Sequence, residues 1–157
     1  MHWANESATQ TFAQALAQQP QLGNAFITLR GDLGAGKTTL TRYLLQALGV
    51  TGRIKSPTYT IVETYETDRC AVSHFDFYRF NDPQEWEDAG FRDIFASPGL
   101  KLAEWPQKAA GLLPVADLDI HLETDADGVR RVTLNAHTPV GEELLQGLTP
   151  SGEGAKP

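Results

Sequence analysis

The apolar residues near the start of the chain recur at a helical spacing. Phe12, Ala15 and Leu16 fall on one face of a helix, and Pro20 ends the pattern. The preceding residues 7–10, Ser-Ala-Thr-Gln, match a capping box, in which the Ser and Gln side chains satisfy free backbone amides. We therefore predict a short helix that is capped by Ser7.

The next segment predicts a strand that leads into a second helix. Residues 25–29 form a compact apolar run with aromatic and β-branched side chains, which is typical of a strand buried on both faces. Residues 31–38 are rich in glycine. After them apolar residues recur at positions 40, 43, 44, 47 and 48, and Gly49 is placed to end the helix. The local order is strand, glycine-rich loop, helix.

Strand patterns dominate the middle of the chain. Aromatic and β-branched residues fill 57–65, and the ranges 71–76 and 100–104 give two more strands that each end in an acid. Between them Asp82 is a favourable N-cap and Pro83 a favourable first helical residue. A short helix is predicted there, before Gly90.

The last part of the chain predicts an antiparallel hairpin. Apolar and polar residues alternate over 118–123, a turn follows at Asp127-Gly128, and 129–136 returns as the second strand. We predict one domain over 1–148 and a disordered tail over 149–157. The expected fold is α/β with three layers, a mostly parallel sheet and an antiparallel hairpin at its edge.

Charge and composition narrow the classes of function. The net charge of the 157 residues is −7, and the acidic residues are concentrated in the second half, so the surface is unsuited to gripping a phosphate backbone. Any role on nucleic acid should be indirect. The single cysteine, Cys70, excludes an internal disulfide. No apolar stretch is long enough to span a bilayer and no secretory signal is evident, so we expect a cytoplasmic protein with no membrane association.

Residues 31–38, Gly-Asp-Leu-Gly-Ala-Gly-Lys-Thr, match the P-loop pattern G-x-x-x-x-G-K-[ST] in its proper strand–loop–helix context. The glycines let backbone amides point at phosphate oxygens, and the positive end of the helix dipole adds to that field. Lys37 would bridge the β- and γ-phosphates, and Thr38 would offer its hydroxyl to Mg²⁺. The motif predicts a P-loop NTPase fold; the alternative is a glycine-rich turn that happens to contain Lys-Thr.

Two acids are candidates for the metal site. Asp76 and Glu104 stand at the ends of predicted strands, and in a parallel sheet such ends face the ligand crevice. One acid would bind the metal and the other would orient water; the alternative is that either one caps a turn. Nothing in the sequence pairs His74 with a metal, so we interpret it as a satisfied strand residue. Trp105 is either a core anchor or an aromatic lid over the site.

Residues 56–58, Ser-Pro-Thr, lie where P-loop proteins often carry a switch segment. The sequence contains no Asn-Lys-x-Asp tetrapeptide, which argues against a guanine-specific GTPase. A small-molecule kinase needs an arginine-bearing lid, and the second half offers only Arg92, Arg130 and Arg131. A kinase and a nucleotide-binding regulatory module without turnover both remain as alternatives to an ATPase.

Four motifs together carry a resemblance to a known family. They are Gly-Asp-Leu-Gly-Ala-Gly-Lys-Thr-Thr at 31–39, Lys-Ser-Pro-Thr-Tyr-Thr at 55–60, His-Phe-Asp-Phe-Tyr-Arg at 74–79 and Glu-Trp-Pro at 104–106. In this order and spacing the chain resembles the TsaE family over nearly its whole length. The resemblance implies a bacterial ATPase that supports N6-threonylcarbamoylation of adenosine 37 in tRNA by binding the TsaB–TsaD heterodimer, with tRNA contacted only through that complex.

The resemblance also implies roles for particular residues. Mg²⁺ would be held by Thr38 and Glu104, and hydrolysis would require Asp76 and Lys37 besides Glu104. The ATP contacts implied at matching positions are Ser7, Gly34, Ala35, Gly36, Lys37, Thr38, Thr39 and Arg130. No arginine lies within the P-loop or the Ser-Pro-Thr segment, and Arg53 and Arg79 are the candidates for an internal arginine finger. We therefore expect hydrolysis to be slow for the protein alone and to be stimulated by its partners.

Overall fold

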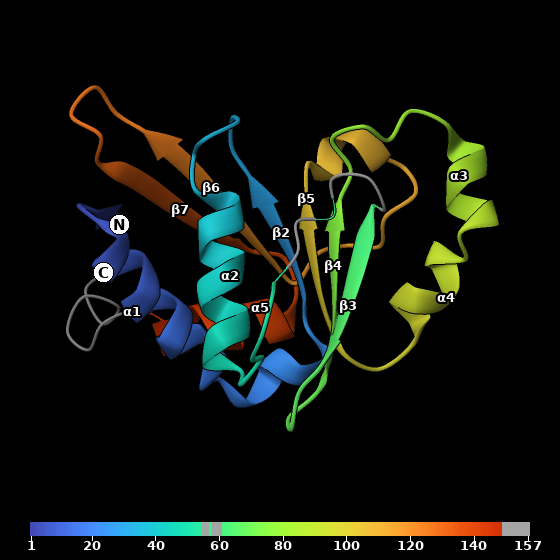
Figure 1. Cartoon of the computed structure of the whole chain (residues 1–157), viewed down its shortest axis with the longest axis horizontal. Coiled ribbons are helices and arrows are strands. Elements are labelled where there is room, and N and C mark those ends of the chain that lie inside the picture. Colours follow the sequence, from blue (N-terminus) through green and yellow to red (C-terminus); the bar gives the residue numbers. More distant parts are fainter. Residues whose placement is uncertain (55–56, 58–60, 149–157) are drawn as a thin grey trace.

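The strands of the protein form one mixed sheet in the order β1-β7-β6-β2-β5-β4-β3 (Figure 1). The computed structural model describes residues 1–54, 57 and 61–148. The bounds of the strands are β1 His2–Trp3, β2 Phe26–Arg30, β3 Val62–Glu66, β4 Ala71–Asp76, β5 Leu100–Glu104, β6 Leu118–Thr124 and β7 Arg130–Ala136.

The four central strands, β6, β2, β5 and β4, run parallel to one another. The β6–β7 pair is the antiparallel hairpin that the sequence predicts. The P-loop fold class with a parallel centre and an antiparallel hairpin is therefore confirmed. The opposite edge is antiparallel as well, because β3 pairs with β4 through a tight reversal of the chain after Glu66.

Helices cover both faces of the sheet and make three layers. The helical bounds are α1 Glu6–Ala17, α2 Lys37–Ala47, α3 Pro83–Asp88, α4 Phe91–Ala96 and α5 Pro139–Leu148, with 3₁₀ helices η1 Pro20–Asn24 and η2 Pro106–Ala109. An apolar cluster joins α1, α2 and α5 to the sheet face that carries Ile27, Leu29 and Ile120. A second, aromatic cluster joins α3 and α4 to the other face, around Phe26 and Phe75.

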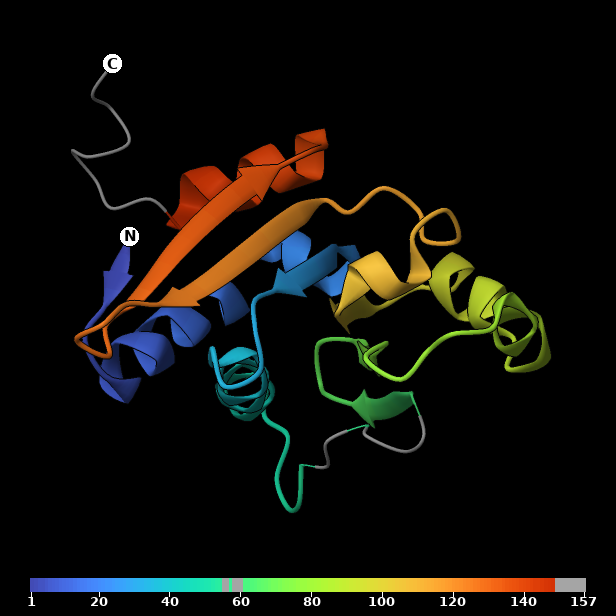
Figure 2. The ribbon, with the colours of Figure 1, turned by 90° about the horizontal axis from the view of Figure 1, so that it is seen from above.

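The two clusters occupy different parts of the sheet. Figure 1 places α3 and α4 at the opposite end of the molecule from α1, and Figure 2 shows the broad face of the β6–β7 hairpin lying open when the molecule is seen from above. The side chains on that open face are polar: Thr133 and Asn135 are exposed, and Asp119 is bound by Thr28 and Arg30.

The first helix begins earlier than predicted, and Ser7 is not its cap. Asn5 is the N-cap, and its Oδ1 accepts a hydrogen bond from the amide of Ala8 at 3.0 Å. Asn caps a helix as well as Ser does, and the extended backbone of Asn5 places its side chain over the first turn. Ser7 lies within that exposed first turn, where its carbonyl accepts a hydrogen bond from the Thr11 hydroxyl.

Five elements of the described residues were not predicted from the sequence. They are the two-residue strand β1, the helix α4, the C-terminal helix α5 and the 3₁₀ helices η1 and η2. The strand predicted over 57–65 is described only from Ile61 onward, and β3 begins at Val62. The predicted switch residues Ser56 and Thr58 and the predicted tail 149–157 lie outside the described residues.

The parallel centre of the sheet brings the predicted site together. The P-loop leaves the end of β2, and in the next two strands Glu104 is paired with Leu29 and Asp76 is paired with Glu104. The carboxyl ends of β2, β5 and β4 therefore meet at one edge of the sheet. Among the described residues, none of the helices is both long and apolar enough to cross a membrane.

Candidate functional site

The P-loop occupies residues 31–36, between the end of β2 and the first residue of α2. Gly31 has a φ of 147°, and a Cβ there would lie 2.5 Å from the carbonyl oxygen of Leu122 on β6. Gly36 is the N-cap of α2 with a φ of 107°. Side chains are therefore excluded at the first position by a neighbouring strand and disfavoured at the second by backbone conformation.

Lys37 is buried at the start of α2, with 4% of its surface exposed. Its Nζ donates a hydrogen bond to the carbonyl of Gly31 and lies 3.8 Å from the centroid of the Trp105 ring. Burial lowers the pKa of the Lys37 ammonium group, and the nearby carboxylates of Glu104 and Asp76 oppose that shift. The ammonium group is thus held across the loop by contacts that suit a cation.

Glu104 ends β5 and is almost completely buried. Its Oε1 lies 3.5 Å from the Thr38 hydroxyl oxygen, and its Oε2 lies 2.6 Å from Nε2 of His74. The second contact could not be predicted from the sequence, because it depends on the alignment of β4 beside β5. The interpretation of His74 as a satisfied strand residue holds only for Nε2, whose partner is one of the two candidate acids, because Nδ1 has no hydrogen-bond partner among the described residues.

Asp76 lies at the end of β4, beside Glu104 in the register of the sheet. Its Oδ1 accepts a hydrogen bond from the amide of Tyr78 at 3.0 Å. Partial burial raises the pKa of the Asp76 carboxyl group, and the neighbouring charge of Glu104 adds to the effect, whereas the Tyr78 hydrogen bond opposes it. The two acids therefore lie in different environments.

A cavity of about 390 Å³ opens over the P-loop and reaches both acids. Most of the residues predicted to form the site line it. The lining residues are Leu33, Gly34, Gly36, Lys37, Thr38, Thr39, Asp76, Tyr78, Arg79, Glu104, Trp105 and Arg130. Of the other two predicted ATP contacts, Ala35 lines a neighbouring cavity and Ser7 lines neither of the two.

Arg130 approaches the P-loop from β7, far away in the sequence. A Cβ on Gly36 would lie 2.8 Å from its guanidinium carbon, so the guanidinium group packs directly against the loop. Its Nη1 donates to the hydroxyl of Thr9 at 3.3 Å, and Thr9 is fully buried in α1. Sequence reasoning missed Thr9, which lies two residues beyond Ser7 and was hidden by the capping interpretation.

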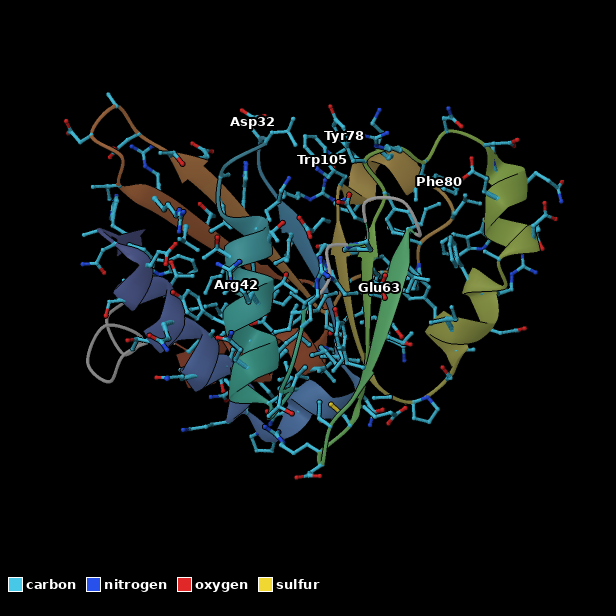
Figure 3. The ribbon with its side chains drawn as sticks, in the orientation of Figure 1. Asp32, Arg42, Glu63, Tyr78, Phe80 and Trp105 are labelled. Atoms are coloured by element: carbon cyan, nitrogen blue, oxygen red, sulfur yellow. The ribbon has the colours of Figure 1, made fainter. Side chains whose placement is uncertain are left out.

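Trp105 separates the phosphate-binding cavity from a second cavity of about 670 Å³. The two cavities share Leu33, Gly34 and Trp105, and Figure 3 shows Asp32, Tyr78 and Trp105 at the same end of the molecule. The Trp105 ring is half-buried and lies 5.0 Å from the Tyr78 ring, between centroids. This position at the rim of the site fits the aromatic lid better than the core anchor.

The donor atoms at Thr38 and Glu104 suit a magnesium ion. One hydroxyl and one carboxylate oxygen face each other next to the phosphate-binding loop, and oxygen ligands with few protein donors are what Mg²⁺ prefers when phosphates complete its shell. The described residues contain no group of three or more His, Cys, Asp or Glu side chains that could hold a metal by themselves. The arrangement therefore fits a metal that binds together with a nucleotide.

Comparison with known proteins identifies the family. The model of the family described as threonylcarbamoyl adenosine biosynthesis protein TsaE matches residues 3–132. The chain belongs to the TsaE family. The matched range includes the P-loop, both acids and Arg130, so every residue that lines the cavity over the P-loop lies within it.

Relatives of known name agree with this assignment. The tRNA threonylcarbamoyladenosine biosynthesis protein TsaE of Haemophilus influenzae is 41% identical over 138 residues, which cover 88% of this chain and 87% of that protein. The TsaE protein of Bacillus subtilis is 36% identical over 132 residues, covering 84% and 82%. The crystal structure of Bacillus subtilis YdiB superposes with a TM-score of 0.79 at 30% identity and covers 94% of this chain and 91% of that one.

Proposed function

We propose that this TsaE-family protein is a Mg²⁺-dependent ATPase that supports threonylcarbamoylation of adenosine 37 in tRNA through the TsaB–TsaD complex. The observation that carries the proposal is the approach of the Thr38 hydroxyl to the Glu104 carboxylate, inside the cavity that the P-loop lines. A nucleotide-binding loop without this pair would support binding alone. With it, the site has the groups that a phosphate-transfer reaction requires.

Different residues of the site would bind the nucleotide and promote its hydrolysis. The amides of residues 34–39 and the α2 dipole would cradle the phosphates, and Lys37 would contact the β- and γ-phosphates. Asp76, at the mouth of the cavity, would orient the attacking water and accept hydrogen bonds from it. Arg130 would add positive charge from the side of the loop opposite to the acids. Thr38 and Glu104 would hold Mg²⁺, which offsets negative charge on the phosphates.

The role in tRNA modification follows from the family and agrees with the charge of the chain. The net charge of −7 disfavours direct binding to tRNA, so the protein would act through a partner that contacts the tRNA itself. TsaB and TsaD are the partners that we propose. The exposed residues Leu33 and Tyr78, at the rim of the cavity, are placed where a partner could sense whether a nucleotide is bound.

The deciding experiment measures ATP hydrolysis by the purified protein with and without TsaB–TsaD, in Mg²⁺ and in excess chelator. Magnesium-dependent hydrolysis that increases with the complex supports the proposal. A panel of nucleosides supplied as phosphate acceptors tests the kinase alternative, and phosphorylation of any of them would overturn the ATPase assignment. Nucleotide binding without turnover, even with the complex present, would favour a regulatory module.

A further inference from the structure

The Glu104 carboxylate has a different partner at each of its two oxygens. Oε1 faces the Thr38 hydroxyl at 3.5 Å, and Oε2 lies 2.6 Å from Nε2 of His74. Both Glu104 and His74 are buried, at 2% and 1% exposure, so water has little access to the contact between them. Two partners on opposite oxygens fix the rotation of the carboxylate about its last side-chain bond.

The sheet register places the histidine where it can reach this carboxylate. In the parallel β4–β5 pair, His74 lies beside Leu102, so Glu104 is the next side chain on the same face. Asp76 is the next side chain on that face of β4. One strand therefore supplies both a candidate catalytic acid and the group that holds the other acid.

The two ring nitrogens of His74 differ, because only Nε2 has a hydrogen-bond partner among the described residues, and that partner is Glu104. Its Nδ1 is buried and has no hydrogen-bond partner among the described residues. A buried polar atom without a partner has a cost, and an apolar ring would fill the same space without it. The contact with Glu104 is the interaction that offsets this cost.

We propose that His74 is the positioning residue of the metal site, which holds Glu104 so that its free oxygen faces Thr38 and the bound ion. The inference rests on the proposed Mg²⁺-nucleotide site and adds a residue to it. Side chains that orient a metal ligand typically change metal affinity about 10- to 100-fold when they are removed. Loss of His74 should therefore weaken the effect of Mg²⁺ on nucleotide binding while the phosphate contacts of the P-loop remain.

The test compares ADP dissociation constants, measured by calorimetry in Mg²⁺ and in excess chelator, for the wild type and six variants. His74→Phe keeps a ring of similar size but removes the hydrogen-bond donor. The gain in ADP affinity that Mg²⁺ provides should therefore fall about 10-fold or more, and the ADP affinity measured in chelator should not change. His74→Gln retains a donor and should recover part of the gain. His74→Met provides a second apolar replacement if the Phe variant does not fold.

Val72→Ala is the matched control, because Val72 is buried on the same face of β4 and one side chain away from His74. It should lower the melting temperature without changing the Mg²⁺-dependent gain. In a Glu104→Gln background, His74→Phe should have no further effect on that gain, since it acts through the carboxylate.

The outcomes separate this inference from the proposed function. A wild type whose ADP affinity does not depend on Mg²⁺ would overturn the metal site itself. A wild type that depends on Mg²⁺ together with folded Phe and Met variants that depend on it equally would overturn the role of His74 alone. An equal loss in Val72→Ala would show that the effect is one of general stability and would also overturn that role.

Discussion

At the scale of single residues, the charged side chains of the site are buried, so the surrounding protein holds them in fixed positions. Lys37 and Glu104 are both nearly inaccessible to water, and Asp76 is half-buried between them and the rim. Charged groups at such positions have fixed surroundings before any ligand arrives, which favours electrostatic stabilisation of a transition state. Two predictions follow from the surroundings of individual residues.

Lys37→Ala should reduce ATP affinity or turnover about 10- to 100-fold, because one charge-assisted contact to phosphate is worth on the order of 1.5–3 kcal/mol. Equilibrium binding of a fluorescent ATP analogue and steady-state hydrolysis measure the two quantities. Lys108→Ala is the control, since Lys108 is exposed on η2 and does not line the phosphate-binding cavity. Unchanged affinity together with unchanged turnover would contradict the phosphate-binding role of Lys37.

Asp76→Asn should abolish hydrolysis and yet stabilise the free protein at neutral pH. Burial raises the pKa of this carboxyl group in the folded state, so the folded state prefers the neutral form. The cost of ionising Asp76 is absent below its unfolded pKa and grows as pH rises through the raised, folded pKa. The Asn side chain stays neutral and can still accept the hydrogen bond from Tyr78.

Urea unfolding in chelator, repeated from pH 3 to pH 8, measures this difference in the free energy of unfolding. The variant and the wild type should be nearly equal in stability at the acidic end, and the variant should gain an advantage as pH increases. A variant that is less stable than the wild type at neutral pH, or one that still hydrolyses ATP, would contradict the prediction.

At the scale of elements, α5 shows how a glycine can be required within a helix. Gly141 and Gly147 both lie in α5, which packs against β6 and β7. A Cβ on Gly141 would lie 1.7 Å from the backbone carbonyl oxygen of Asp117, which cannot move without disturbing the start of β6. A Cβ on Gly147 would meet only the side-chain amide of Gln19, the end of a flexible side chain, which can rotate away if it gives up its hydrogen bonds to the carbonyls of Ala15 and Gly147.

Gly141→Ala should therefore destabilise the protein by about 1–3 kcal/mol, although alanine is the better helix former. Gly147→Ala, the matched substitution in the same helix, should change stability by no more than roughly 1 kcal/mol because the intrinsic preference for alanine offsets the displaced side chain. Thermal and chemical unfolding of both variants give the comparison. Equal effects of the two substitutions on stability would contradict the prediction that the Asp117 carbonyl oxygen leaves no room for a side chain at position 141.

The same helix explains part of what the sequence could not predict. Glycines at positions 141 and 147 lower the helical preference of this segment. The helix forms because its leucines pack against α1 and the hairpin. The P-loop, the strand before it and the helix after it could be predicted, because all their signals are local in sequence. The prediction that Ser7 caps α1 was wrong, because Asn5 and Ser7 are equally favourable capping residues by their local sequence.

At the scale of the whole molecule, the contacts that complete the site join distant parts of the chain. Arg130 and Thr9 are 121 residues apart, and His74 and Glu104 are 30 apart. Such pairs depend on which elements become neighbours in the fold, and a local hydrophobic pattern predicts the type of an element but not its neighbours. The resemblance already implied Arg130 as an ATP contact, and the structure places its guanidinium group directly against the P-loop, far from it in sequence.

The intact protein should hydrolyse ATP slowly by itself and faster with TsaB–TsaD. A group supplied by a partner to a P-loop site can be worth about 10³–10⁵ in rate, and the rim of this cavity is exposed at Leu33 and Tyr78. Turnover measured over a titration of the complex should rise and saturate. Fast turnover by the isolated chain that the complex does not increase would instead indicate a self-sufficient site, completed by Arg130 and Arg79.

The strand order also constrains how this protein is made. β2 lies at the centre of the sheet, but its neighbours β5 and β6 are both synthesised long after it. β1 likewise cannot pair until β7 has been synthesised. Gly31 packs on the carbonyl of Leu122, so the nucleotide-binding loop lacks one of its walls until most of the chain has left the ribosome. A bound nucleotide would therefore stabilise only a nearly complete polypeptide, and shorter nascent chains must keep the open edges of β2 from pairing with one another.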